Sequence, residues 1–274
     1  MINQTIKKYY RRTDVRFEIV KQLYRREFAV LKPSYMDQSK KNMRMLRCHN
    51  LNHFDYIMQY LKFFSTDNFY NFYKSLATYY NGIPIQKLNY TERGNGDWKQ
   101  THFKEMGSYD LMIDIDAGDH NDIQHAQYSA QIITEFYNKL NVPYYLIFSG
   151  KGFHIITPGN YFNKSKNIIE SDNIYFLYSA IARYLYNNFS ELVDTGIYDP
   201  RRLCKLAYSL AIYDDSVYVA YPLNYYVELD DFRLKEYNLN GFDKPVTKRG
   251  MMLFNEKGNV KQLEGVVVNG KEKV

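Results

Sequence analysis

The sequence predicts an α+β fold, in which an N-terminal α/β lobe at residues 1–108 precedes a βαββαβ unit at residues 109–223. Within the second region, apolar runs of strand length alternate with segments whose apolar residues recur every three or four positions. Their order is strand, helix, strand, strand, helix, strand, as in a ferredoxin-like split βαβ unit. Residues 224–274 are expected to form a C-terminal extension, with a hairpin within residues 250–268 and a loose tail.

The N-terminal lobe mixes helical and extended segments. Thr13 can cap a helix, because apolar residues follow it at helical spacing at Val15, Ile19 and Leu23. Gly, Pro and Asn residues close the lobe with a turn and a polar loop. We expect an amphipathic helix at residues 54–64, strands at residues 27–31, 42–47 and 75–80, the turn at residues 81–84 and the loop at residues 89–97.

The βαββαβ unit begins with an apolar strand that ends at Asp116. Asn121 or Asp122 can cap the next helix. Two strands joined by a glycine turn, a second helix and a last strand follow, the strands being expected at residues 142–148, 153–157 and 216–221. The apolar side of the first helix comprises Ile123, Ala126, Ala130, Ile133, Tyr137 and Leu140, and that of the second comprises Ile174, Leu177, Ile181, Tyr184 and Leu185.

The composition indicates a partner that carries phosphate groups. A formal net charge of +6 and a pI near 8.9 fit a polyanionic partner. Only Cys48 and Cys204 are present, which argues against a disulfide framework and a cysteine-rich zinc site. The sequence contains no long apolar run, and its N-terminus lacks the apolar core of a signal peptide. We therefore expect an intracellular protein, cytoplasmic or in a eukaryote nuclear, with no membrane partner.

Two acids at the end of the central strand are the first candidate for chemistry. Asp114 and Asp116 point to the same side of the strand, because strand side chains alternate between faces. Two carboxylates held together repel unless a cation lies between them, and hard oxygen ligands suit Mg²⁺ or Mn²⁺. The alternative is that one acid caps the following helix and the other is solvated, since short motifs recur by chance.

The second candidate is the turn Ser149-Gly-Lys-Gly-Phe-His154. Backbone N–H groups of a glycine-rich turn can form a cavity for an anion, with Lys151 as a point charge and Ser149 as a hydroxyl donor. His154 lies early in the next strand. A glycine hairpin and a lone strand histidine are also common as purely structural features.

The third candidate follows the second helix. Asp194 comes after the apolar Val193, and the cations Arg201, Arg202 and Lys205 follow closely. In a helical turn, Arg202 and Lys205 would share one side. A solvated charged turn is the simpler interpretation of this segment alone. Acids able to hold metal ions, together with cations able to neutralise a triphosphate, are the components of nucleotidyl transfer.

These motifs resemble those of the archaeo-eukaryotic primase superfamily, which carries a hydrophobic-D-h-D motif, an S-G-x-G-x-H motif on a neighbouring strand and a later hydrophobic-Asp motif. Here the three look like Met112-Ile-Asp114-Ile-Asp116, Ser149-Gly-Lys-Gly-Phe-His154 and Val193-Asp194. The N-terminal half is similar to the small catalytic subunit of archaeal and eukaryotic DNA primase at residues 26–30, 43–45 and 75–84. The resemblance covers roughly residues 9–223, and the order of three motifs makes it fairly specific.

The resemblance implies a primase fold, with the N-terminal lobe packed on a ferredoxin- or RRM-like unit and an active cleft between their sheets. It implies a DNA primase or primase-polymerase, which synthesises primers on single-stranded DNA from nucleoside triphosphates. A large primase subunit or a helicase could assist in trans. Asp114, Asp116 and Asp194 would hold two Mg²⁺ or Mn²⁺ ions, and Ser149, Lys151, His154, Arg202 and Lys205 would bind the nucleotide.

The sequence departs from the family pattern in three places. Residues 117–148 contain no cysteine, and His120 and His125 alone cannot rebuild the zinc knuckle common in the family, so we expect no structural zinc. Lys151 is the only cation of its turn. A histidine often found after the third motif is replaced around Leu210 and Ala211.

Two other functions remain open. A metal-dependent nuclease also gathers acids around two cations, although it has no triphosphate to hold. A catalytically silent replication or partner-docking module could have kept the fold, and the altered region near Ala211 leaves this alternative open.

Overall fold

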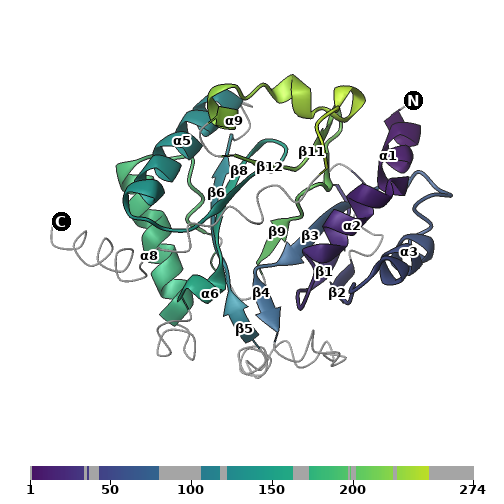
Figure 1. The fold of residues 1–274 in the computed structure, drawn as a ribbon, viewed down its shortest axis with the longest axis horizontal. Helices are drawn as coiled ribbons and strands as arrows, with labels where there is room; N and C mark the ends of the chain where they lie inside the picture. Colours follow the sequence, from purple (N-terminus) through teal and green to yellow (C-terminus); the bar gives the residue numbers. More distant parts are fainter. Residues whose placement is uncertain are drawn as a thin grey trace.

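The protein has a mixed α+β fold with antiparallel sheets, as the computed structural model shows (Figure 1). The structure describes residues 2–33, 36, 43–79, 106–117, 122–162, 173–196, 198, 202–224 and 227–246. Two four-stranded sheets lie side by side in the middle of the molecule, and the longer helices lie on their outer sides. The segments expected at residues 81–84, 89–97 and 250–268 fall outside the described residues.

The N-terminal sheet has the order β2-β1-β3-β9, and every pair in it is antiparallel. Its bounds are β1 Phe28–Leu31, β2 Met43–Leu46, β3 Asn71–Ser75 and β9 Leu203–Lys205. Three helices lie beside it, namely α1 (Ile2–Arg11), α2 (Thr13–Lys21) and α3 (Leu51–Tyr60). Their buried residues, among them Val15, Ile19 and Phe54, form one apolar core with Phe28 and Phe72 of the sheet.

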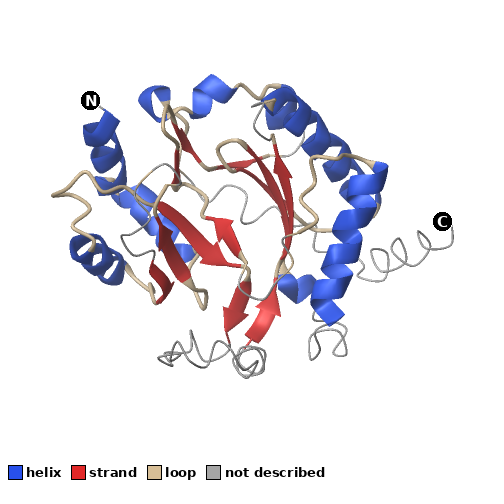
Figure 2. Ribbon diagram, turned by 180° about the vertical axis from the view of Figure 1, so that it is seen from behind, coloured by secondary structure: helices blue, strands red, loops and turns tan. Residues whose placement is uncertain are grey.

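The second sheet has the order β12-β7-β8-β6, again with antiparallel pairs. Its bounds are β6 Leu111–Asp116, β7 Tyr145–Phe148, β8 Gly152–Thr157 and β12 Tyr221–Leu223. Helices α5 (Ile123–Lys139) and α8 (Asn173–Asn188) cover its face away from the N-terminal sheet (Figure 2). The predicted apolar stripe of α5 is buried at Ala126, Ala130, Ile133 and Tyr137.

Shorter elements complete the described chain. The pair β4 (Ala77–Tyr79) and β5 (Met106–Tyr109) lies at one end of the two sheets, and β10 (Leu210–Ile212) pairs with β11 (Val217–Val219). The remaining helical segments are α6 (Gly159–Phe162), α9 (Val227–Asp230), η2 (Leu234–Tyr237) and η3 (Leu239–Gly241). None of the helices among the described residues combines the length and the apolar character needed to cross a membrane.

Several predicted elements need correction. Thr13 is the first residue of α2 rather than its cap, and the N-cap residue Arg12 makes no side-chain capping bond. Helix α3 starts three residues earlier than expected, because the Asn50 side chain accepts the His53 N–H. Of the two candidates, Asp122 caps α5 by accepting the His125 N–H. The strand expected at residues 75–80 is the end of β3 followed by β4.

The last strand of the unit also differs from expectation. Residues 216–221 divide between β11 and β12, and β12 pairs with β7 at the edge opposite β6. The position beside β6 is taken by residues 192–194, through an antiparallel bridge between Ile115 and Val193. This segment runs parallel to β8 with β6 between them, which is the arrangement of a split βαβ unit.

Residues 203–219 pass from the second sheet to the N-terminal lobe and back. Strand β9 pairs with β3, and Leu206, Leu210, Ile212, Val217 and Val219 belong to the N-terminal core, before β12 rejoins the second sheet. The predicted boundary at residue 109 thus separates β1–β3 from β6–β8, while part of region 109–223 packs with the first lobe. Residues 203–219 therefore connect the two walls of the site described next.

Candidate active site

Strands β6 and β8 place an acid beside a histidine. Asp114 and His154 are register partners in adjacent strands, so their side chains lie on the same face of the sheet. His154 Nε2 lies 3.3 Å from Asp114 Oδ1. Burial opposes the charged form of His154, but the Asp114 carboxylate outweighs it and raises the pKa of the imidazole to about 10. His154 is therefore a cation at neutral pH.

Backbone hydrogen bonds bring Asp194 next to Asp114. The N–H of Asp194 donates to the carbonyl of Asp114 at 2.9 Å, and the N–H of Asp116 donates to the carbonyl of Leu192 at 3.2 Å. The sequence prediction that Asp114 and Asp194 meet is thus consistent with the fold. Asp194 Oδ1 accepts the Gly196 N–H at 2.8 Å, which fixes the turn that follows.

Arg202 lies between the two carboxylates. Its Nη2 is 3.9 Å from Asp114 Oδ2 and 3.7 Å from Asp194 Oδ2. Its Nε is buried without a hydrogen-bond partner among the described residues. Burial raises the pKa of Asp114, but His154 and then Arg202 outweigh it, and the pKa falls below its ordinary value. Asp114 is therefore ionised. The Arg202 contacts are longer than hydrogen bonds, so the guanidinium and the two carboxylates interact through their charges.

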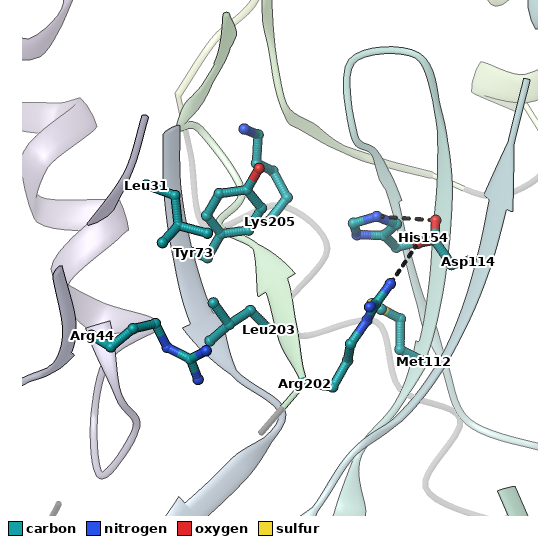
Figure 3. A pocket seen from close by; sticks show the side chains of 9 residues that line it. All are labelled: Leu31, Arg44, Tyr73, Met112, Asp114, His154, Arg202, Leu203 and Lys205. Carbon is teal, nitrogen blue, oxygen red and sulfur yellow. Dashed lines mark ion pairs between the residues drawn. The ribbon is translucent and has the colours of Figure 1, made fainter. Parts of the chain in front are cut away.

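Asp114, His154 and Arg202 line a pocket of about 550 Å³ between the two sheets (Figure 3). Asp114, His154 and Arg202 lie on one side of it, and residues of the N-terminal sheet lie on the other. Four basic side chains against one acid among the lining residues make the pocket suitable for an anion, above all when Lys205 is protonated. The lining comprises Leu31, Arg44, Tyr73, Met112, Asp114, His154, Arg202, Leu203 and Lys205.

Lys205 enters the pocket from β9. It does not share a helical turn with Arg202, as the sequence had suggested, because residues 203–205 form a strand. Its Nζ donates to Asn71 Oδ1 at 2.8 Å and lies 4.6 Å from the centre of the Tyr73 ring. Burial lowers the pKa of Lys205 to about 7, because the charged ammonium is poorly solvated there.

The glycine turn of the second motif faces another direction. Ser149 N–H donates to the Gly152 carbonyl at 2.9 Å and closes the turn, in which Gly150 has a φ of +122°. Lys151 Nζ lies 4.3 Å from the centre of the Tyr213 ring. Neither Ser149 nor Lys151 lines the 550 Å³ pocket; Lys151 borders a smaller one of about 160 Å³. The structure therefore brings His154 of this motif to Asp114, but not its lysine.

Metal binding depends on how many oxygen ligands converge. Asp116 is exposed and does not line the pocket, although strand alternation puts it on the face of Asp114. Among the described residues, no three His, Cys, Asp or Glu side chains gather to hold a metal ion. Asp114 and Asp194 are the two carboxylates that the backbone brings together, and Mg²⁺ is typically bound by one or two carboxylates plus substrate phosphates. The three-acid, two-ion site stays a prediction.

The resemblance implied a cleft between the sheets of the two lobes, but sequence reasoning named no site residue on its N-terminal wall. Arg44 and Tyr73 carry no motif, and they reach the pocket only because β2, β1 and β3 lie side by side. Arg44 forms a two-pronged pair with Glu27, at 2.5 and 3.1 Å. Cys204 Sγ lies 3.7 Å from His154 Nδ1, on the side of the ring away from Asp114. The apolar strands at residues 27–31 and 42–47 were the only local signal.

Comparisons with known proteins give a distant structural likeness. No protein-family model and no curated protein match the sequence. Among solved structures, the "Crystal structure of primase RepB'" is similar over 94% of this chain and 62% of that chain, with 9% identity and a TM-score of 0.41. The chain thus spans less than two thirds of that protein. A likeness at this level does not establish a shared activity, so we base the following proposal on the residues of the site.

Proposed function

We propose that the protein is a metal-dependent nucleotidyltransferase, a DNA primase or primase-polymerase that copies single-stranded DNA from nucleoside triphosphates. The observation that carries the proposal is Arg202, which lines the pocket and lies within ion-pair distance of both Asp114 and Asp194. Paired carboxylates that can hold a divalent ion, beside an arginine that can bind a phosphate, are what in-line transfer of a nucleotide requires.

The cations of the pocket would bind the triphosphate. Arginine presents a planar fork of donors that matches phosphate oxygens, and Arg202 lines the pocket with its Nη2 between the two carboxylates. Protonated His154 lies in the same pocket, and a bound phosphate would favour the charged form of Lys205, whose pKa burial lowers to about 7. Negative charge developing on the phosphates would then meet positive charge from several sides. Lys151 and Ser149 lie away from these groups, so in this proposal their contribution is smaller than the motif suggested.

Asp114 and Asp194 would hold the divalent ion, with Asp116 as the expected third ligand. When bound, Mg²⁺ or Mn²⁺ would neutralise charge on the reacting phosphate and favour deprotonation of the attacking hydroxyl. His154 would orient the Asp114 carboxylate by donating to Oδ1. Arg202 would then leave the Asp114 and Asp194 carboxylates and contact the phosphates instead, so that its positive charge stays paired with a negative one.

One assay separates the alternatives. The purified chain is incubated with a single-stranded template, Mg²⁺ or Mn²⁺ and labelled ATP or dATP, with and without a primer. Extension of a primer, or appearance of short new strands, supports the proposal when Asp114→Asn abolishes it. Degradation of labelled DNA without nucleotides would instead indicate the nuclease. Triphosphate binding without incorporation under either metal would indicate a catalytically silent module.

A further inference from the structure

The net positive charge of the chain comes from its first 26 residues. They contain eight Lys or Arg and two acids, for a net charge of +6, and the remainder of the chain is neutral overall. This segment forms helices α1 and α2 and the turn after α2. The apolar sides of the helices are buried at Ile6, Tyr10, Val15 and Ile19, so their polar sides face solvent.

Two aromatic rings project from the same segment. Phe17 is 49% exposed and Tyr24 is 68% exposed, which is unusual for large apolar side chains. Each carries a cation of its own: Lys21 Nζ lies 4.1 Å from the Phe17 ring centre, and the Arg25 guanidinium carbon lies 5.3 Å from that of Tyr24. Exposed rings beside cations are typical of sites where bases stack and phosphates pair.

Helix α1 contributes two further exposed cations to the segment. Lys8 and Arg11 are exposed and share one side of the helix, and α2 begins just after Arg12. Several other cations of the segment pair with surface acids, such as Lys21 with Glu18 at 3.0 Å. Pairs of this kind contribute little to stability, so phosphates can replace the acids.

The segment is fixed to the chain that leaves the candidate active site. Tyr9 OH donates to the Tyr208 carbonyl at 2.9 Å, and Tyr10 OH accepts the Leu210 N–H at 2.8 Å. Gln22 exchanges two hydrogen bonds with the backbone of Ala207, at 2.9 and 3.0 Å. Residues 206–210 directly follow β9, which supplies Leu203 and Lys205 to the pocket. A ligand held on α1 and α2 would therefore be held rigidly relative to the pocket.

We infer that the α1–α2 surface, comprising Lys8, Arg11, Phe17, Lys21, Tyr24 and Arg25, binds single-stranded nucleic acid. Charge complementarity selects a polyanion, and the exposed rings favour unpaired bases over a duplex, whose bases are already stacked. The inference rests on the proposed function in taking this ligand to be the template. Binding itself requires neither nucleotide nor metal, so it can be tested without catalysis.

The experiment measures the affinity of the full chain for fluorescein-labelled oligothymidylate by anisotropy, over a series of salt concentrations. We expect Lys8→Glu/Arg11→Glu to weaken binding at least tenfold and to reduce the salt slope by about 1.4, because each lost single-strand phosphate contact removes about 0.7. Phe17→Ala/Tyr24→Ala should weaken binding about tenfold or more with a smaller change of slope, because stacking rather than charge is lost.

Matched control variants carry the same kinds of substitution on α5 and α8, the helices that cover the second sheet. Lys139→Glu/Arg183→Glu reverses two exposed charges, and Tyr128→Ala/Phe176→Ala removes two exposed rings. Equal losses in the controls, or unchanged binding in the test variants, would overturn the inference. So would tighter binding to vesicles containing phosphatidylglycerol than to DNA, with only vesicle binding lost in the variants. Asp114→Asn should bind the oligonucleotide normally, which separates failure of this surface from failure of the proposed catalysis.

Discussion

The backbone N–H of Asp194 donates to the backbone carbonyl of Asp114 at 2.9 Å. These two acids are far apart in the sequence, yet the main chain keeps them adjacent regardless of their side-chain conformations. The Val193–Ile115 bridge reinforces this placement. Because the main chain holds the pair together, the carboxylate charges can be removed one at a time without separating the segments. This makes the site unusually suitable for isosteric substitution.

Asp194→Asn should abolish nucleotide incorporation while leaving the fold intact. The asparagine Oδ1 can still accept the Gly196 N–H, as the aspartate does at 2.8 Å, so only the charge is lost. We expect the rate to fall about a hundredfold or more, as for loss of a preorganised electrostatic group. Single-turnover incorporation measures the rate and circular dichroism the fold; Asp231→Asn, an exposed acid elsewhere, is the control. Wild-type rates in the Asp194 variant would remove this residue from the mechanism.

Arg202→Ala should weaken triphosphate binding without weakening metal binding. A hydrogen bond to a charged group contributes about 1.5–3 kcal/mol, so nucleotide affinity should fall about tenfold or more. The same variant removes the cation that lies 3.9 and 3.7 Å from the two carboxylates. Mn²⁺ affinity without nucleotide, measured by electron paramagnetic resonance, should therefore stay equal or increase. Weaker Mn²⁺ binding in this variant but not in Arg183→Ala would contradict a shared position for arginine and metal.

Local patterns predicted the second sheet well. The apolar strand ending at Asp116, the glycine turn and the two long helices are confirmed, because each has a complete periodic signal within one segment. The β6–β8 pairing that joins Asp114 to His154 follows from two such strands and a short connection. Half of the candidate site is thus contained in segments whose structure is determined locally.

Long-range pairing accounts for what the sequence could not predict. Residues 192–194 are too short to read as a strand, and their partner β6 lies far away in the chain. Lys205 looked like a surface cation at helical spacing from Arg202, but pairing of β9 with β3 buries it beside Asn71. The direction of Lys151 is likewise determined by the distant Tyr213. Each of these depends on contacts between segments far apart in the sequence, which no local period encodes.

Lys205→Met should stabilise the protein at neutral and low pH and have little effect in alkali. Burial lowers the pKa of Lys205 from 10.5 to about 7 in the folded protein. Between pH 7 and pH 10.5 the unfolded chain therefore binds more protons than the folded protein. Wild-type stability should therefore rise with pH across this window, and the variant should lack that rise. Its advantage should be on the order of 4 kcal/mol below about pH 7 and vanish near pH 10.5. Asn71 Oδ1 keeps the Ile212 N–H as a donor, so no new unpaired group arises.

Urea unfolding at pH 6, 8 and 10 measures the effect, with Lys139→Met as an exposed control. A stability difference that is the same at all three pH values would show that the buried amine is not the cause.

Gly150→Ala should destabilise the second-motif turn, and Ala211→Gly should restore part of the loss. At a φ of +122°, a Cβ at residue 150 is strained by about 1–3 kcal/mol, and it would also collide with the Ala211 Cβ. Removing that Cβ relieves the collision but leaves the backbone strain. The four unfolding free energies form a double-mutant cycle, in which positive coupling is expected. Strict additivity would indicate that Ala211 does not restrict the turn, and that its small size has another cause.

Asp110→Asn should destabilise the contact between the lobes. Asp110 is 2% exposed, pairs with Arg26 at 2.8 Å and accepts the Gly159 N–H at 2.8 Å. Arg26 also donates to the carbonyls of Ser75 and Leu76, at 3.1 and 2.7 Å, so the pair joins the N-terminal lobe to the start of β6. Neutralising the acid leaves a buried guanidinium unpaired, which typically costs about 3–5 kcal/mol.

The matched control is Asp55→Asn, which breaks the exposed Arg16–Asp55 pair at 2.6 Å. An exposed pair should contribute less than about 1 kcal/mol, although its atoms are just as close. Arg26→Met/Asp110→Asn should recover much of the loss, because no unpaired charge remains. Urea unfolding of the three variants at one pH decides the matter. If Asp110→Asn lowered the free energy of unfolding no more than Asp55→Asn does, the Arg26–Asp110 pair would not be what holds the two lobes together.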